Sequence, residues 1–173
     1  PPTAHLDVFP YMKRHSGHIT VHASEAFGLP SIGEALQWCG ADRLGHGVRI
    51  VDDLTAVDVE PVLGRLAAYV RDNRVPLEMC PSSNVQTGAI RDLASHPLKL
   101  YYNLGLRVTV NTDNRLVTDT TVSKELWLAH TQMGLGLEDL KQIVLAGFKS
   151  AFLPFHVKQA SLRKVSEELR PFT

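Results

Sequence analysis

The chain has 173 residues, with 18 lysines and arginines against 18 aspartates and glutamates, and two cysteines. This length supports one sizeable core, so residues 1–173 are expected to form a single segment of one domain. The balanced charge argues against a nucleic acid or an anionic membrane as partner, and no apolar run reaches the roughly 18 residues of a membrane span. Cys39 and Cys80 lie outside any Cys-x-x-Cys motif and are expected to be small buried hydrophobes of a cytoplasmic protein.

Strands and helices are expected to alternate along the first half of the chain. The apolar pattern indicates a strand at 18–21, and Ser31 with Glu34 predicts a capping box that starts a helix. A second strand is expected around 43–44. The next helix is predicted from the helical spacing of apolar side chains at Val62, Leu63, Leu66, Ala67 and Val70.

The second half repeats this alternation. Apolar and polar residues alternate at 75–79 and at 106–110, which is typical of strands. A short helix is expected between the two, opening at His96 and Pro97. Three further helices are predicted at roughly 123–133, 137–152 and 154–169. Four strand and helix units of about 30 residues each are typical of a parallel sheet with crossover helices.

Polar residues suited to catalysis follow each predicted strand. They are His22 with Glu25, then His46, then Glu78 with Ser82 and Ser83, and finally Asp113 with Asn114. The carboxyl ends of parallel strands meet at one edge, so these side chains are expected to converge. Two histidines with several carboxylates suit a metal ion together with a general acid or base.

Each residue taken alone also has a structural interpretation. His22 fits a strand-end imidazole bonded to backbone, and Asp113 fits the cap of a turn. The glycines beside His46 allow a substrate to approach, although they serve any tight strand exit. Glu78 either pairs with a cation such as protonated His46 or lies on a solvated strand face. The remaining histidines are expected to be surface or capping residues: His5, His15, His18, His96, His130 and His156.

Five stretches of the chain, in this order, resemble one enzyme family. They are "TVHASEAFG", "RLGHGVRI", "LEMCPSSNVQTGAI", "HPLKLYYNLGLRVTVNTD" and "SAFLP". They are similar to the Val-His-Ala-Gly-Glu, Gly-His-Gly and Glu-Val-Cys-Pro-Thr-Ser-Asn motifs, the last strand and the closing helix of adenosine deaminases. These are zinc aminohydrolases built on a (β/α)8 barrel. The resemblance implies an α/β fold with parallel strands, a Zn²⁺ cofactor, and conversion of adenosine to inosine and ammonia, with 2′-deoxyadenosine also accepted.

The resemblance also implies a role for each candidate residue. His22 and Asp113 would be zinc ligands. Glu25 would give a proton to N1 of the purine while water attacks C6. His46 would act beside that water as base or electrostatic partner, and Glu78 would orient the His46 imidazole.

Two positions depart from the family pattern. Ser24 replaces a glycine and adds bulk close to the purine, and Asn114 replaces an aspartate that contacts purine N7. An asparagine amide can donate a hydrogen bond to unprotonated N7. The substrate is therefore expected to be adenosine, with adenine or aminodeoxyfutalosine as alternatives. A non-catalytic remnant that binds a purine or serves as a structural module is the alternative of a different class.

The chain lacks the His-x-His motif that supplies two further zinc ligands in the family. A full barrel of this type needs about 250 residues. The chain is therefore expected to be the carboxy-terminal half of a TIM-type barrel, strands five to eight. Alone it is expected to be inactive and to aggregate, dimerise or need the missing amino-terminal half, because half a barrel leaves open strand edges and apolar surface.

Overall fold

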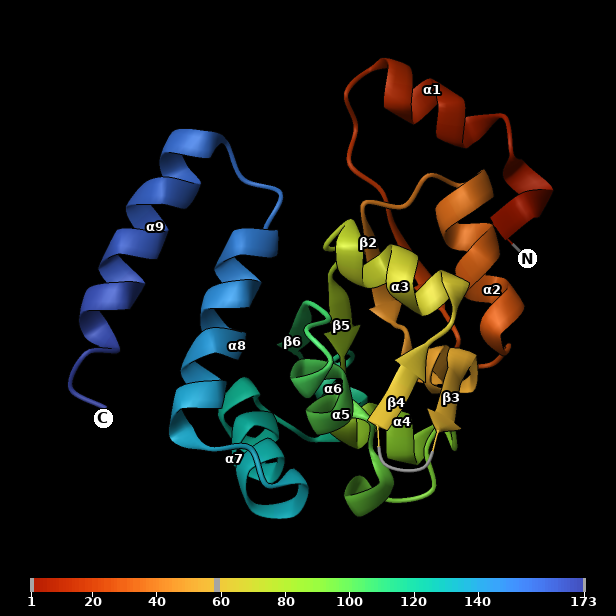
Figure 1. Cartoon of the computed structure of the whole chain (residues 1–173). Coiled ribbons are helices and arrows are strands. Elements are labelled where there is room, and N and C mark those ends of the chain that lie inside the picture. Colours follow the sequence, from red (N-terminus) through yellow and green to blue (C-terminus); the bar gives the residue numbers. More distant parts are fainter. Residues whose placement is uncertain (1, 58–59, 173) are drawn as a thin grey trace.

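A four-stranded parallel sheet forms the centre of the protein in a computed structural model, which describes residues 2–57 and 60–172. Its strands are β1 (Thr20–Ala23), β2 (Arg43–His46), β5 (Leu77–Met79) and β6 (Val108–Val110). They lie in the order β1-β2-β5-β6, and every neighbouring pair is parallel. The predicted α/β fold with parallel strands is confirmed, and β1 and β6 are the outer strands (Figure 1).

Helices connect and cover the strands. The α-helices are α1 (Val8–Arg14), α2 (Leu29–Gly33), α3 (Arg65–Asp72), α4 (Pro81–Gln86), α5 (Leu98–Asn103), α6 (Arg115–Thr118), α7 (Val122–Met133), α8 (Leu137–Ser150) and α9 (Phe155–Glu168). Short 3-10 helices lie at Pro2–His5, Val48–Asp53 and Leu93–Ser95, and a π-helix at Glu34–Trp38 follows α2. Helix α8 packs on β6, and α9 packs on the outside of α8 (Figure 1). Among the described residues, no helix combines the length and apolar character needed to cross a membrane.

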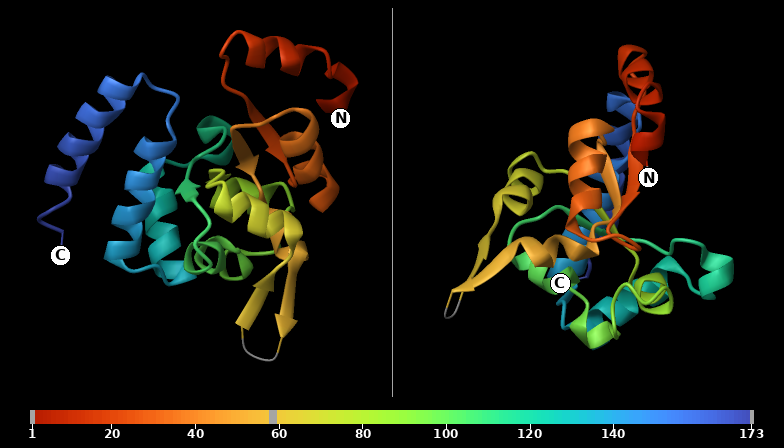
Figure 2. Two further views of the ribbon diagram at one scale, coloured as in Figure 1. Left: turned by 45° about the horizontal axis from the view of Figure 1, so that its top comes forward. Right: turned by 90° about the vertical axis from the view of Figure 1, so that its right-hand side faces the viewer.

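The segment after β2 differs from the sequence prediction. Val62 was expected in a helix with Leu63, but both lie in β4 (Glu60–Leu63), which pairs antiparallel with β3 (Leu54–Val57). This hairpin projects away from the parallel sheet (Figure 2). The helix begins only after Gly64, whose backbone is extended, and a Cβ at this position would meet the Oδ1 atom of Asp53 at 2.3 Å. Asp53 also accepts a hydrogen bond from the Ala67 amide at 2.7 Å, which stabilises the start of α3.

The predicted capping box is also wrong. Helix α2 begins at Leu29, two residues before Ser31, with Pro30 in its first turn. The proline lacks an amide, so a helix start there leaves fewer donors unsatisfied. The Ser31 hydroxyl instead accepts a hydrogen bond from the Ser24 amide at 2.8 Å. This bond attaches α2 to the loop that follows β1.

The core lies on one face of β2 and β5, where the register partners Leu44 and Leu77 have no exposed surface. Tyr101 of α5 is also fully buried, and its phenol connects α5 to the turn after β2. Its hydroxyl donates to the Val48 carbonyl at 2.6 Å and accepts from the Val51 amide at 2.7 Å. Because Tyr101 satisfies two backbone groups at once, it fixes the chain directly after His46.

Replacement of Tyr101 by phenylalanine tests this contact. Tyr101→Phe leaves the buried Val48 carbonyl and the Val51 amide without this partner, and should lower the free energy of unfolding by about 1–3 kcal/mol. Urea unfolding measures the change. Tyr69, which is 51% exposed on α3, provides the matched control. An equal loss for Tyr101→Phe and Tyr69→Phe would contradict the structural role of the Tyr101 hydroxyl.

Candidate active site

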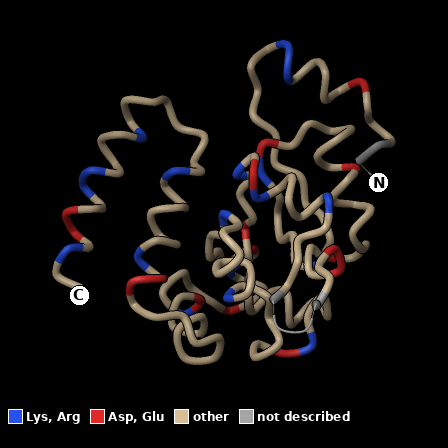
Figure 3. Tube along the Cα trace, in the orientation of Figure 1, with Lys and Arg blue, Asp and Glu red and all other residues tan. Residues whose placement is uncertain are grey.

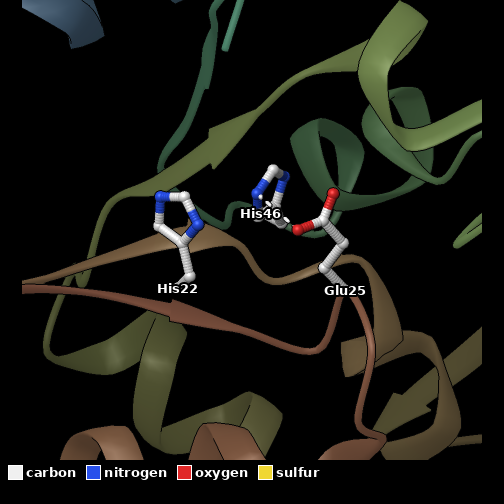
Figure 4. A group of neighbouring side chains, drawn as sticks. All are labelled: His22, Glu25 and His46. Carbon is white, nitrogen blue, oxygen red and sulfur yellow. Dashed lines mark ion pairs between the residues drawn. The ribbon is translucent and has the colours of Figure 1, made fainter. Parts of the chain in front are cut away.

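The parallel register brings His22, Glu25 and His46 together at the carboxyl end of the sheet. His22 of β1 lies opposite Gly45 of β2, and His46 follows at the next register position. One potential ligand atom from each of His22, Glu25 and His46 lies within 4.8 Å of the others. Figure 4 shows the three side chains pointing toward a common space. The convergence predicted from the strand ends is present for these three residues.

Gly45 makes room for the His22 ring. A Cβ at position 45 would lie 2.6 Å from the His22 Cδ2 atom and 3.3 Å from its Cα atom. Real Cβ atoms do not approach so closely, so any larger residue at position 45 would displace the imidazole. The glycine before His46 is therefore needed for the position of His22.

Three candidate residues have left-handed backbone conformations. The φ angles are +68° for Ser24, +68° for His46 and +53° for Asp113. Residues with a Cβ rarely adopt this conformation, and such strain is concentrated at functional sites. Ser24 occupies the position of the family glycine, which adopts this conformation without strain. Its hydroxyl accepts a hydrogen bond from the Arg49 amide at 3.2 Å and so contacts the turn after β2.

His46 is the most enclosed of the converging groups, with only 1% of its side chain exposed. Its Nε2 atom lies 3.3 Å from Glu25 Oε2, without the alignment of a hydrogen bond, and has no hydrogen-bond partner among the described residues. Burial lowers the pKa of His46 below its ordinary value, although Glu25 and Asp113 act in the opposite direction. His46 therefore favours the neutral form and directs an unsatisfied nitrogen into the site.

Asp113 lies on the other side of the same space. Its Oδ2 atom accepts a hydrogen bond from the Ser83 hydroxyl at 2.7 Å, which fixes the carboxylate. A cavity of about 130 Å³ has a lining that includes Asp113 and both site histidines. The lining residues are His22, Gly45, His46, Glu78, Cys80, Asn111 and Asp113. The four predicted strand ends thus contribute to one cavity.

Glu78 does not make the predicted contact with His46. Its Oε1 atom pairs with Arg43 Nε at 3.0 Å, while the bond to His46 Nδ1 comes from Asn84 Nδ2 at 3.0 Å. Burial raises the pKa of Glu78, and the nearby Arg43 and His22 partly oppose this effect. Arg43 is the cation that stabilises the Glu78 carboxylate, because the two side chains project from neighbouring strands on the same face of the sheet.

The two residues predicted to contact substrate lie at different places. Ser24 is buried and lines a cavity of about 570 Å³ with His22 and Glu25. Asn114 is exposed, and its Oδ1 atom accepts from the Val117 amide at 3.2 Å, which caps α6. The cap uses only the oxygen of the Asn114 amide, so its nitrogen is still available as a donor.

Sequence reasoning missed three buried polar residues near the site. Asn84 is fully buried, and His96 is only 5% exposed and not at the surface, although its Nδ1 atom accepts from the Leu98 amide at the start of α5, which fits the capping alternative. Glu125 of α7 is fully buried, and its two oxygens accept from the Thr120 hydroxyl and from the Ser82 amide. The Ser82–Glu125 contact joins segments 43 residues apart, so no local pattern indicated it. The expectation that Cys39 and Cys80 are buried is confirmed.

The residues present fit a zinc ion. Zinc is bound in proteins by imidazole nitrogens and carboxylate oxygens, often from three protein side chains in a catalytic centre. His22 and Asp113 offer an imidazole nitrogen and a carboxylate to one cavity, and Glu25 and His46 lie beside His22. The buried His46 Nε2 atom without a hydrogen-bond partner in the described chain is consistent with a site completed by a further group.

The family model for adenosine deaminase matches residues 1–168 of the chain. The chain belongs to the adenosine deaminase family. Adenosine deaminase 1 of Streptomyces coelicolor is 55% identical over 166 residues, which cover 95% of this chain and 42% of that relative. Adenosine deaminase of Mycobacterium tuberculosis is 55% identical over 167 residues, which cover 95% of this chain and 46% of that relative. The chain therefore spans less than half the length of these relatives.

Solved structures show the same fold in this family member. An adenine deaminase from Arthrobacter aurescens superposes with a TM-score of 0.88 at 24% identity, over 98% of this chain and 49% of that one. An amidohydrolase from Burkholderia ambifaria, solved with bound zinc, gives a TM-score of 0.79 at 20% identity, over 99% of this chain and 47% of that one. The parallel α/β fold is thus structurally similar to part of a TIM-barrel amidohydrolase.

Alanine at Gly45 tests the packing of the His22 ring. Gly45→Ala should displace the imidazole, shift its NMR signals and lower the free energy of unfolding by about 1–3 kcal/mol. Gly33→Ala is the matched control, because a Cβ there meets no atom within 4 Å and the residue is helical. Unchanged His22 signals in Gly45→Ala, at unchanged stability, would contradict the close approach.

The burial of His96 predicts a pH-dependent contribution to stability. Burial lowers the pKa of His96 to about 4, against about 6.5 in the unfolded chain. As the pH falls, His96 is therefore protonated in the unfolded chain before it is protonated in the folded chain. The stability that neutral His96 provides is complete above pH 6.5 and is lost as the pH falls toward 4. The loss is roughly 3 kcal/mol, because the pKa of His96 falls from 6.5 to about 4 on folding.

Urea unfolding between pH 7 and pH 4 measures this effect. The unsubstituted chain and His96→Gln differ in their free energy of unfolding. This difference should decrease by roughly 3 kcal/mol between pH 7 and pH 4. His156→Gln, which replaces an exposed histidine of α9, is measured in parallel as the control. A constant difference for His96→Gln would show that His96 titrates normally.

Proposed function

We propose that the chain supplies the catalytic half of an enzyme that hydrolyses adenosine to inosine and ammonia, with 2′-deoxyadenosine as a second substrate. The observation that carries the proposal is the convergence of His22, Glu25 and His46 at the ends of parallel strands in an adenosine deaminase family member. Adenosine deaminases that are 55% identical over almost the whole chain support the substrate. On this proposal the described segment is strands five to eight of the barrel.

His22 and Asp113 would hold zinc, together with ligands from the rest of the enzyme. When bound, zinc supplies a nucleophile at neutral pH, because it lowers the pKa of water to about 7. His22 is positioned by the open space above Gly45, and Asp113 by the Ser83 hydroxyl. Both ligands are thus held by rigid neighbours before any metal arrives.

Glu25 would act as a proton donor, and His46 would bind the attacking water. Glu25 would donate to N1 of the purine, which makes C6 electrophilic when water attacks there. His46 Nε2, buried and directed into the site, would form a hydrogen bond with the attacking water. Ammonia leaves from C6 after a proton reaches the amino group, and inosine is the other product.

Ser24 and Asn114 would lie against the purine. Ser24 lines the larger cavity with Glu25, and the amide nitrogen of Asn114 is available to donate to N7. The cavity of about 570 Å³ is within the range of small-molecule sites. A purine nucleoside is therefore the substrate class that the chain is proposed to bind.

The proposed partner is the amino-terminal half of the barrel, or a second copy of the chain in its absence. The outer strands β1 and β6 each pair on one side only within the described sheet. An apolar cavity of about 320 Å³ lies beside β6, between the strand and helices α7 and α8. Further strands would cover both features.

Neither a nucleic acid nor a membrane is proposed as a partner. Acidic and basic residues are equal in number and are interspersed along the described backbone (Figure 3), so the chain has no net charge that would attract a polyanion. The cytoplasm is the proposed compartment, because its reducing conditions suit two free cysteines.

Reconstitution tests the proposal. The full chain is mixed with a polypeptide that carries the amino-terminal half of the barrel, including its His-x-His motif, and with zinc. Loss of adenosine absorbance should appear only in the mixture. Glu25→Gln should lower the rate by at least about 10²-fold and leave zinc content unchanged, because it removes a proton donor and no metal ligand.

Lys164→Gln on α9, far from the site in the sequence and exposed, serves as the control and should retain full activity. Adenine and aminodeoxyfutalosine are assayed in parallel. Activity on one of these and not on adenosine would overturn the proposed substrate. A zinc-loaded mixture without activity on any 6-aminopurine would overturn the proposed reaction.

A further inference from the structure

A buried chain of hydrogen bonds leads from His96 through Asn84 to His46. His96 Nε2 lies 3.2 Å from Asn84 Oδ1, and Asn84 Nδ2 lies 3.0 Å from His46 Nδ1. The exposed fractions are 5% for His96, 0% for Asn84 and 1% for His46. Because water does not reach these groups, their protons must be arranged to satisfy one another.

The donor and acceptor roles in this series of hydrogen bonds are fixed at the His96 end. The Leu98 amide, which can only donate, lies 3.2 Å from His96 Nδ1. Nδ1 must therefore accept, and the proton of neutral His96 is on Nε2, which donates to Asn84 Oδ1. The Cys80 amide donates to the same oxygen at 3.3 Å. Two donors thus define which atom of the Asn84 amide is oxygen.

The orientation of Asn84 decides the tautomer of His46. With its oxygen occupied, the amide directs its NH₂ group at His46 Nδ1, which must accept with a lone pair. The proton of the neutral His46 ring is then on Nε2, the atom that faces Glu25. Glu78, which was expected to orient the His46 imidazole, is paired with Arg43 instead.

We propose that Asn84 is a positioning residue that holds neutral His46 in its Nε2–H tautomer, and that His96 in turn holds Asn84. The catalytic meaning of this arrangement rests on the proposed function: His46 offers the attacking water a hydrogen-bond donor. The interaction does not require metal or substrate, since every bond in it is made by this chain.

NMR of the full chain, labelled with ¹⁵N, tests the proposal without any turnover. Correlations between ring carbon-bound protons and ring nitrogens distinguish a protonated nitrogen from an unprotonated one. In the unsubstituted chain at neutral pH, His46 should show a protonated Nε2 and an unprotonated Nδ1. In Asn84→Asp the new carboxylate accepts from Nδ1, and the proton should move to that nitrogen. Asn103→Asp, which adds the same charge at an exposed position, should leave His46 unchanged.

A protonated Nδ1 in the unsubstituted chain, or an unchanged tautomer in folded Asn84→Asp, would overturn the proposal. The unsubstituted spectrum decides the first point even if Asn84→Asp does not fold. In the reconstituted enzyme, Asn84→Asp should lower kcat by at least about tenfold with KM almost unchanged. The two proposals can fail separately. If NMR shows the predicted His46 tautomer but the reconstituted protein deaminates no purine, the proposed function is refuted and the role of Asn84 stands.

Discussion

The parallel register of β1, β2 and β5 is the constraint on which the site depends. It places His22 against Gly45 and Gly45 against Glu78, so one row across the sheet contains the first histidine, the space for its ring, and the carboxylate paired with Arg43. A shift of one residue would turn each of these side chains to the opposite face. The absence of a side chain at Gly45 is therefore as important to the site as the presence of His22.

Buried polar contacts then fix the loops that leave these strands. Ser83 holds Asp113, Asn84 holds His46, and Glu125 accepts from the Ser82 amide. These three bonds originate from consecutive residues at the start of α4, so this short helix connects the segments after β2, β5 and β6. Such preorganisation offsets the backbone strain at His46 and Asp113, because neighbouring contacts hold both residues in their left-handed conformations.

The sequence was sufficient for the parts of the structure that repeat locally. Alternating apolar residues predicted the strands around 75–79 and 106–110, and polar residues at strand ends predicted the convergence of His22 and His46. The hairpin containing Val62 was missed, because its apolar residues also fit a helical spacing and the pairing with β3 is a tertiary contact. The burial of His96 and Asn84 was missed because a lone histidine or asparagine has no pattern, and because the contact of Asn84 with His46 is a tertiary contact 38 residues away in the sequence.

On the proposed function, this chain provides zinc ligands from the ends of parallel strands. Metal analysis of the reconstituted enzyme after dialysis, with and without substitutions at His22 and Asp113, tests it most directly. Stoichiometric zinc should be present in the unsubstituted assembly and should be lost in His22→Ala and in Asp113→Ala, while both variants keep their fold by circular dichroism. Full retention of zinc in both variants would contradict the account.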